Sequence, residues 1–132
     1  MFKVSPEDDY SIRLFSKMLE YGISEMEQFK RLPELPPADQ DAVLLHLGEL
    51  AFSCQQASNL MLGKEALVEV EKKWLLERLD SFLENFLGRD DYWEYAQIAY
   101  FLERFDKDAS LRFLRKCGEH PDPEIRELAG YE

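Results

Sequence analysis

Threonine is absent from the 132-residue chain, and valine and isoleucine occur only four times each. These β-branched residues are the ones that suit a pleated strand, so their scarcity argues against a β-sheet. Leucine and glutamate, which favour helices, occur 20 and 17 times. The composition therefore predicts an all-α fold.

Long apolar runs are also missing. The longest, residues 98–102, has five residues, far short of the ~20 that span a bilayer. The first ten residues contain no apolar stretch typical of a secretory signal. The two cysteines, Cys54 and Cys117, lack CxxC spacing and fall in expected helices, where buried free thiols are favoured over a disulfide. These features predict a cytoplasmic protein.

Positive charge is scarce, with 16 Lys and Arg residues against 27 Asp and Glu residues and a net charge of −11. Nucleic acids and anionic membranes are polyanions and would be repelled by such a chain. We therefore expect neither as a partner. The acidity favours a basic protein partner, or serves solubility alone.

Motifs of catalysis are missing too. The six glycines are never adjacent, and neither a dinucleotide fingerprint nor a phosphate loop nor a Gly-x-Ser-x-Gly elbow is present. His46 precedes Glu49 by one helical turn, the reverse of a helical metal motif, and a local hydrogen bond is expected there. His120 precedes Pro121 and is interpreted as a turn residue. No enzyme activity and no cofactor are predicted.

Clustered carboxylates offer one alternative. Asp90 and Asp91, with Glu94 one turn later, are dense enough for a cation site. Acidic residues at a helix start are favoured by the helix dipole in any case. Asp106 and Asp108 have the same explanation, since no calcium-loop pattern surrounds them. No metal site is predicted.

Glycine and proline divide the chain into six to seven expected helices within a single domain. In residues 1–37, one helix starts at Ser5-Pro6 and ends at Gly22, and a second starts with a Ser24–Glu27 capping box. The apolar face of the first helix comprises Ile12, Phe15, Met18 and Leu19. The prolines that stop the second helix and force an extended connection are Pro33, Pro36 and Pro37.

The sequence of residues 38–88 predicts a long antiparallel helical hairpin. Its first helix starts at Asp39 or Asp41 and runs to about Leu62, and Gly63 ends it. Its second helix runs from about Lys64 to Leu87.

Residues 89–132 predict three shorter helices. Asp90 or Asp91 caps the first, which spans about residues 91–105, and the second ends near Cys117. Asp122-Pro123 begins the last, because aspartate caps well and proline fits the first helical position.

A weak internal repeat marks this last third. Sliding the chain by 33 residues aligns Tyr92 with Ile125 and Ala96 with Ala129. Residues 122–129, Asp-Pro-Glu-Ile-Arg-Glu-Leu-Ala, resemble the opening phrase of HEAT-type helical repeats. The resemblance implies antiparallel helical hairpins stacked as a short α-α superhelix, and a scaffold that grips other proteins. In general character the chain also resembles small acidic bacterial immunity proteins, which block a toxin by binding it.

Five aromatic residues lie within residues 92–102. Helical spacing places Tyr95, Ile98, Ala99, Leu102 and Phe105 on a core face. Trp93 and Tyr100 fall on a different stripe, which either packs on the preceding hairpin or stays exposed. If exposed, it forms an aromatic site for a basic protein. The acidic residues expected to flank this site are Asp90, Asp91, Glu94 and Glu103.

Three hypotheses follow. The first is a non-catalytic module that binds a basic protein, in its sharpest form an immunity protein neutralising a toxin. The second is an assembly protein that forms a homodimer through the aromatic stripe. The third, an enzyme or metal protein built on carboxylates, has the least support.

Overall fold

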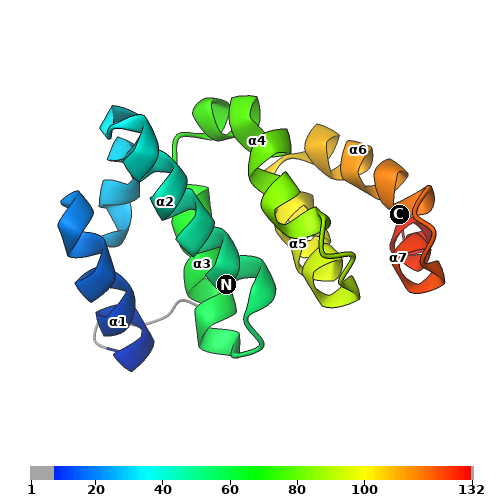
Figure 1. Cartoon of the computed structure of the whole chain (residues 1–132), viewed down its shortest axis with the longest axis horizontal. Coiled ribbons are helices and arrows are strands. Elements are labelled where there is room, and N and C mark those ends of the chain that lie inside the picture. The colour runs from blue at the N-terminus through cyan, green and yellow to red at the C-terminus, as the bar shows by residue number, and fades with distance from the viewer. Residues whose placement is uncertain (1–7, 132) are drawn as a thin grey trace. The chain divides into compact units, whose positions relative to one another are not determined.

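The computed structural model describes residues 8–131, which contain seven α-helices and no strand (Figure 1). The prediction of an all-α fold with about seven helices is therefore confirmed. The chain divides into two compact units, residues 1–85 and residues 86–132, and the boundary falls in the last turn of α4 (Lys72–Leu87). The two units are described in turn.

The first unit begins with α1 (Asp9–Met18), and the carboxylate of Asp8 caps it by accepting the Tyr10 N–H at 2.8 Å. The predicted Ser5-Pro6 start lies outside the described residues. A 3₁₀ turn, η1 (Leu19–Tyr21), follows and ends at Gly22, whose φ of 76° is left-handed. Glycine adopts this conformation without steric cost, so Gly22 terminates the segment as predicted.

The predicted inner face of α1 is wrong at two positions. Ile12 and Leu19 are 51% and 61% exposed, whereas Leu14 and Met18 are buried. The buried stripe also includes Ser11. Met18 was predicted for this face and is buried, whereas a pattern based on apolar residues could not include Ser11, which is polar.

The next helix, η2 (Met26–Glu34), is a 3₁₀ helix whose capping differs from the prediction. The Gln28 side chain accepts the N–H groups of Ser24 and Glu25, so the box pairs Glu25 with Gln28 rather than Ser24 with Glu27. Pro33 lies inside η2 instead of stopping it, and the extended backbone begins at Leu35.

The two long helices predicted for residues 38–88 are wrong. The segment forms α2 (Pro37–Gly48), a π turn η3 (Glu49–Ser53), α3 (Ala57–Glu69) and then α4. Proline at the first helical position starts α2 earlier than the predicted Asp39 or Asp41. The break between η3 and α3 is extended at Cys54 and Gln56, and the Gln56 side chain caps α3.

Gly63 does not end a helix, as predicted, but lies inside α3. A Cβ atom there would be 2.8 Å from the Leu47 carbonyl oxygen and from the Ala51 Cα. Glycine therefore allows the backbones of α3, α2 and η3 to approach closely. The largest fully buried side chains of this unit are Met18, Phe29, Leu32, Leu47, Phe52, Leu62, Leu67 and Leu75.

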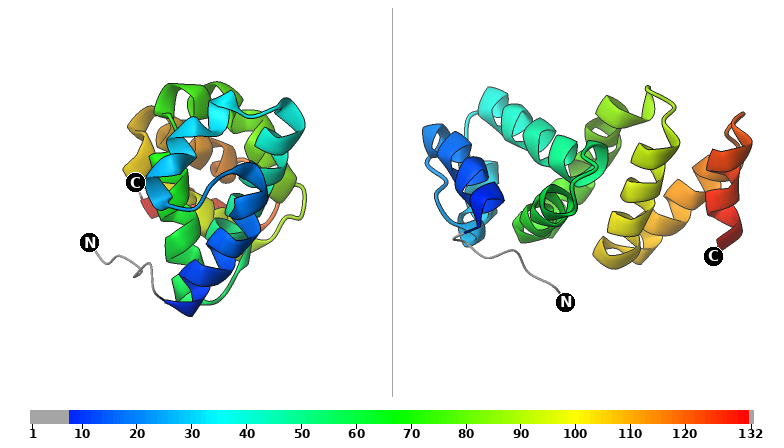
Figure 2. Two further views of the ribbon diagram at one scale, coloured as in Figure 1. Left: turned by 90° about the vertical axis from the view of Figure 1, so that its left-hand side faces the viewer. Right: turned by 90° about the horizontal axis from the view of Figure 1, so that it is seen from below.

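The second unit consists of α5 (Tyr92–Phe105), α6 (Lys107–Gly118), α7 (Pro123–Glu127) and the 3₁₀ turn η4 (Leu128–Tyr131). The α5, α6 and α7 helices pack against one another, with α5 and α6 side by side (Figure 2). The three helix starts are confirmed. The carboxylates of Asp91, Asp106 and Asp122 accept backbone N–H groups of the first turns at 2.9–3.1 Å.

The 33-residue repeat does not match the register of these helices. It aligns Asp91 with Glu124, although the corresponding cap of α7 is Asp122. It also aligns Tyr92, which is 39% exposed, with the fully buried Ile125. The HEAT-like resemblance therefore depends on the phrase in residues 122–129.

Candidate functional site

The α5 helix has a buried face and an exposed face. Tyr95, Ile98, Leu102 and Phe105 are buried as predicted, while Ala99 is half-buried. The Tyr95 ring stacks on Phe113 of α6 with 5.9 Å between centroids, and its hydroxyl donates to the Leu87 carbonyl at 3.1 Å. These contacts fix the rotation of α5, and so they fix which side chains face outward.

The outward face carries large aromatic side chains. Tyr92, Trp93 and Tyr100 are 39%, 37% and 54% exposed. Trp93 and Tyr100 are two helical turns apart and share one stripe. Both side chains of this stripe are at least one-third exposed, and its two interpretations remain predictions.

Glu94 does not belong to the acidic border of this stripe. Its side chain is buried, and the Arg89 guanidinium donates to its Oε2 at 2.7 Å. A buried carboxylate is costly unless it is paired, and Arg89 supplies that pairing. The expectation failed because a glutamate in a first helical turn is normally exposed, and no spacing pattern marks an arginine in the preceding loop as its partner.

The other acidic residues remain at the surface. Asp91 and Glu103 are exposed, and the Asp90 side chain is 66% exposed. We call Trp93 and Tyr100, with Asp90, Asp91 and Glu103, the aromatic–acidic strip. Asp91 also caps α5 through its Oδ1, so this carboxylate has a structural role as well.

Sequence reasoning missed that His120 contacts this border. Its Nδ1 accepts the Asp122 N–H at 2.9 Å, so the ring proton lies on Nε2, which donates to Asp90 Oδ1 at 2.8 Å. The ring also packs edge-on against Tyr95, 5.2 Å between centroids. His120 thus links the loop before α5, where Asp90 has a φ of 51°, to the loop before α7.

The described residues hold no group of three or more His, Cys, Asp or Glu side chains that could bind a metal ion. Asp90 and Glu94, considered above for a cation site, instead contact His120 and Arg89. Within residues 8–131, no helix is both long and apolar enough to cross a membrane.

The cysteines do not offer an activated nucleophile. Burial raises the pKa of the Cys117 thiol to about 11, and the smaller effect of Lys116 acts in the opposite direction. Burial, and then Glu49, raise the pKa of Cys54. Cys54 was expected to be buried in a helix, but it is partly exposed on extended backbone after η3. Both thiols stay protonated near neutral pH.

His46, on α2, is half-buried in the first unit. Burial, and then Lys17, lower its pKa, while Glu49 raises it. The imidazole is therefore neutral at pH 7.

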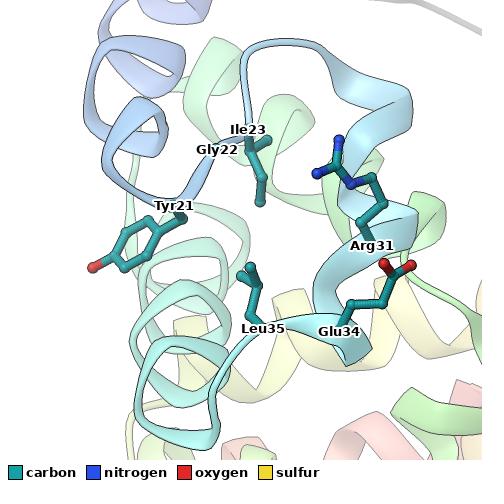
Figure 3. A pocket seen from close by; sticks show the side chains of 6 residues that line it. All are labelled: Tyr21, Gly22, Ile23, Arg31, Glu34 and Leu35. Atoms are coloured by element: carbon teal, nitrogen blue, oxygen red, sulfur yellow. The ribbon is translucent and has the colours of Figure 1, made fainter.

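The first unit contains a small cavity of about 140 Å³ between the Gly22 turn and η2 (Figure 3). Arg31 and Glu34 reach it from η2, and Ile23 and Leu35 supply apolar walls. Ligand sites usually measure about 300–1,000 Å³. The cavity therefore has room for a side chain or a few waters rather than for a substrate.

Comparison with protein-family models, with curated proteins and with solved structures found no match to this chain. Any role for the candidate site must therefore be inferred from the geometry and chemistry of its residues.

Proposed function

We propose that the chain is a non-catalytic protein-binding module whose aromatic–acidic strip engages a basic surface of a partner protein. The observation that carries the proposal is the exposure of Trp93 and Tyr100, two turns apart on one helix. Tryptophan and tyrosine are the residues most enriched among those that dominate binding energy at protein interfaces. Two of them on a rigid helix lose little conformational entropy on binding.

Charge supports a basic partner. Asp90 and Asp91 immediately precede α5, Glu103 lies near its C-terminal end, and all three carboxylates are at the surface. Lysine and arginine side chains pair with carboxylates and also stack on aromatic faces. The net charge of −11 adds long-range attraction, which speeds the encounter with a basic protein.

The sharpest form of the proposal is a cytoplasmic bacterial immunity protein that blocks a basic toxin domain. The HEAT-like phrase and the acidity are what support it. An organised binding surface of this kind needs neither a cofactor nor a metal.

The test starts from capture of partners on the immobilised full chain at low ionic strength. The captured protein is purified, and its binding kinetics are measured against the unchanged chain and against Trp93→Ala and Tyr100→Ala. We expect each substitution to weaken binding about 30-fold or more, as for residues that contribute about 2 kcal/mol. Val68→Ala is the matched control, because Val68 is 56% exposed on α3 of the other unit.

Charge is tested separately. We expect the association rate to fall steeply with salt and to fall in Glu103→Gln, but not in the exposed control Glu77→Gln. Capture of no basic protein, or equal affinity of the Trp93 variant, would overturn the proposal. A dimer in sedimentation that Trp93→Ala dissociates would replace it with the homodimer hypothesis.

A further inference from the structure

The outer face of α6 differs in charge from the rest of the chain. Its buried side is formed by Ala109, Phe113 and Cys117, which fix the rotation of the helix. The residues exposed on the opposite side are Lys107, Asp108, Leu111, Arg112, Arg115, Lys116 and Glu119. This face thus carries four cations and two carboxylates in a chain where acidic residues outnumber basic ones 27 to 16.

Helix electrostatics explain only part of this pattern. Cations near a helix C-terminus interact favourably with the dipole, which accounts for Arg115 and Lys116. The same dipole disfavours Lys107 at the first helical position and has little effect on Arg112 in the middle. Asp108 lies one turn before Arg112, yet within the described part of the chain neither Arg112 nor Arg115 forms an ion pair.

An exposed apolar side chain lies among these cations. Leu111 is 39% exposed, with Lys107 one turn before it and Arg115 one turn after it. Residues three and four apart are neighbours on a helix surface, so Leu111 lies between Lys107 and Arg115 along the helix, with Asp108 also beside it. We call Lys107, Leu111, Arg112, Arg115 and Lys116 the α6 basic face.

We propose that the α6 basic face binds an acidic segment of a partner protein. An apolar side chain of the segment covers Leu111, and its carboxylates pair with Arg112 and Arg115. Guanidinium groups bind carboxylates through two parallel hydrogen bonds. Such a contact is therefore directional as well as electrostatic.

Two considerations favour an acidic protein segment over a nucleic acid. A polyphosphate is long and dense in charge, so it feels the repulsion of the whole −11 chain. A short acidic segment feels mainly the local face, since charges beyond roughly 8 Å are screened at physiological salt. Leu111 adds affinity only for a ligand that has an apolar group to bury.

The α6 basic face shares no residue with the aromatic–acidic strip, which lies on α5 and the loop before it. Loss of the proposed function through Trp93 and Tyr100 would leave this inference unaffected. If both sites operate, this unit binds two surfaces of opposite charge.

The experiment uses the full chain and a fluorescein-labelled 12-residue peptide of glutamate and leucine as the probe, followed by fluorescence polarisation. A second peptide carries glutamine in place of glutamate. We expect saturable binding of the acidic peptide, weakened at least about fivefold in Arg112→Gln/Arg115→Gln and about two- to threefold in Leu111→Ala. The control Arg13→Gln/Lys73→Gln makes the same charge change at exposed positions of the other unit and should alter binding less than twofold.

Circular dichroism verifies that each variant is folded. Absence of saturable binding, equal binding of the glutamine peptide, or equal weakening by the control variant would overturn the proposal. So would tighter binding of a 12-nucleotide single strand through the same arginines, which would identify a nucleic acid as the occupant. Self-association in sedimentation that Arg112→Gln/Arg115→Gln abolishes would identify a second copy instead.

Discussion

Glu94 and Arg89 form a pair in which one partner is buried and the other is half in solvent. The Glu94 side chain is 6% exposed and that of Arg89 is 46% exposed. Removing a partner from a fully buried pair costs about 3–5 kcal/mol, because a charge is left without compensation. The exposure of Arg89 lets water replace part of its contribution, so the expected cost is smaller here.

We predict that Arg89→Ala lowers the free energy of unfolding by about 2 kcal/mol, measured by urea denaturation. Adding Glu94→Gln to this variant should restore about half of the loss, since the buried group is then neutral. Arg104→Ala, at an exposed position on α5, the helix that carries Glu94, should change the free energy of unfolding by less than about 0.5 kcal/mol. If the double variant is less stable than Arg89→Ala, the unpaired charge is not the cause of the loss.

Cys117 gives the chain a pH dependence at its alkaline end. Burial raises the pKa of this thiol from 9.0 to about 11, so the folded state favours the protonated form. The contribution of the buried, protonated thiol to folding stability is complete below pH 9. It is lost as the pH rises towards 11, because the thiol of the unfolded chain ionises in this range while that of the folded chain stays protonated. We predict that the stability advantage over Cys117→Ala shrinks by roughly 2 kcal/mol between pH 8 and pH 11.

Taking the difference between the two proteins removes the titration of tyrosines and lysines that they share. A difference that stays constant up to pH 11 would show that the thiol is ionised equally in both states. Denaturant titrations at four or five pH values are sufficient for this measurement.

At the scale of the helix, the close packing of α3 against α2 and η3 depends on Gly63. Replacing glycine by alanine inside a helix normally stabilises it by about 1 kcal/mol. At Gly63 the added Cβ would lie 2.8 Å from the Leu47 carbonyl oxygen, and backbone cannot move aside as a side chain can. We predict that Gly63→Ala instead destabilises the chain by about 2 kcal/mol or more, as overpacking does.

Gly118→Ala is the matched control. There the new Cβ would make ordinary contact with the Ala129 Cβ at 3.4 Å, and the position is also helical. Its effect should stay within about 1 kcal/mol in either direction. Equal stability changes at the two positions would mean that the helices separate at Gly63 without cost.

The helices of residues 86–131 were predictable because their signals are local. An aspartate that caps a helix can be recognised from the three or four residues that follow it, as at Asp91, Asp106 and Asp122. The break at residues 54–56 has no proline or glycine, and Gly63 is required by a contact with a segment twelve or more residues earlier. Both depend on tertiary packing, which no local pattern encodes.

The candidate site divides in the same way. Helical periodicity separated Trp93 and Tyr100 from the core side of α5. The pairing of Glu94 with Arg89 and of Asp90 with His120 depends on how loops fold back, so the sequence placed these carboxylates together on one border. Most residues of the α6 basic face occur in the sequence as Leu111-Arg112 and Arg115-Lys116, but no motif marks them within an acidic chain.

At the scale of the whole molecule, the surplus of negative charge opposes compactness. A net charge of −11 on 132 residues creates mutual repulsion that is stronger in the folded chain than in the expanded one. Ion pairs such as Lys30–Glu69, 3.5 Å apart with the lysine largely exposed and the glutamate partly exposed, contribute little in compensation. Salt screens both effects, but the repulsion extends over longer distances and is screened more completely.

We therefore predict that the free energy of unfolding rises by about 0.5–1 kcal/mol between 10 mM and 150 mM sodium chloride at pH 7. The rise should be smaller at pH 5, where protonation of part of the carboxylates reduces the net charge. Urea denaturation at both pH values gives the measurement, and potassium chloride controls for specific binding of the cation. A fall in stability with salt would mean that attractive pairs outweigh the repulsion, and it would also weaken the case that unneutralised surface charge is present to attract a basic partner.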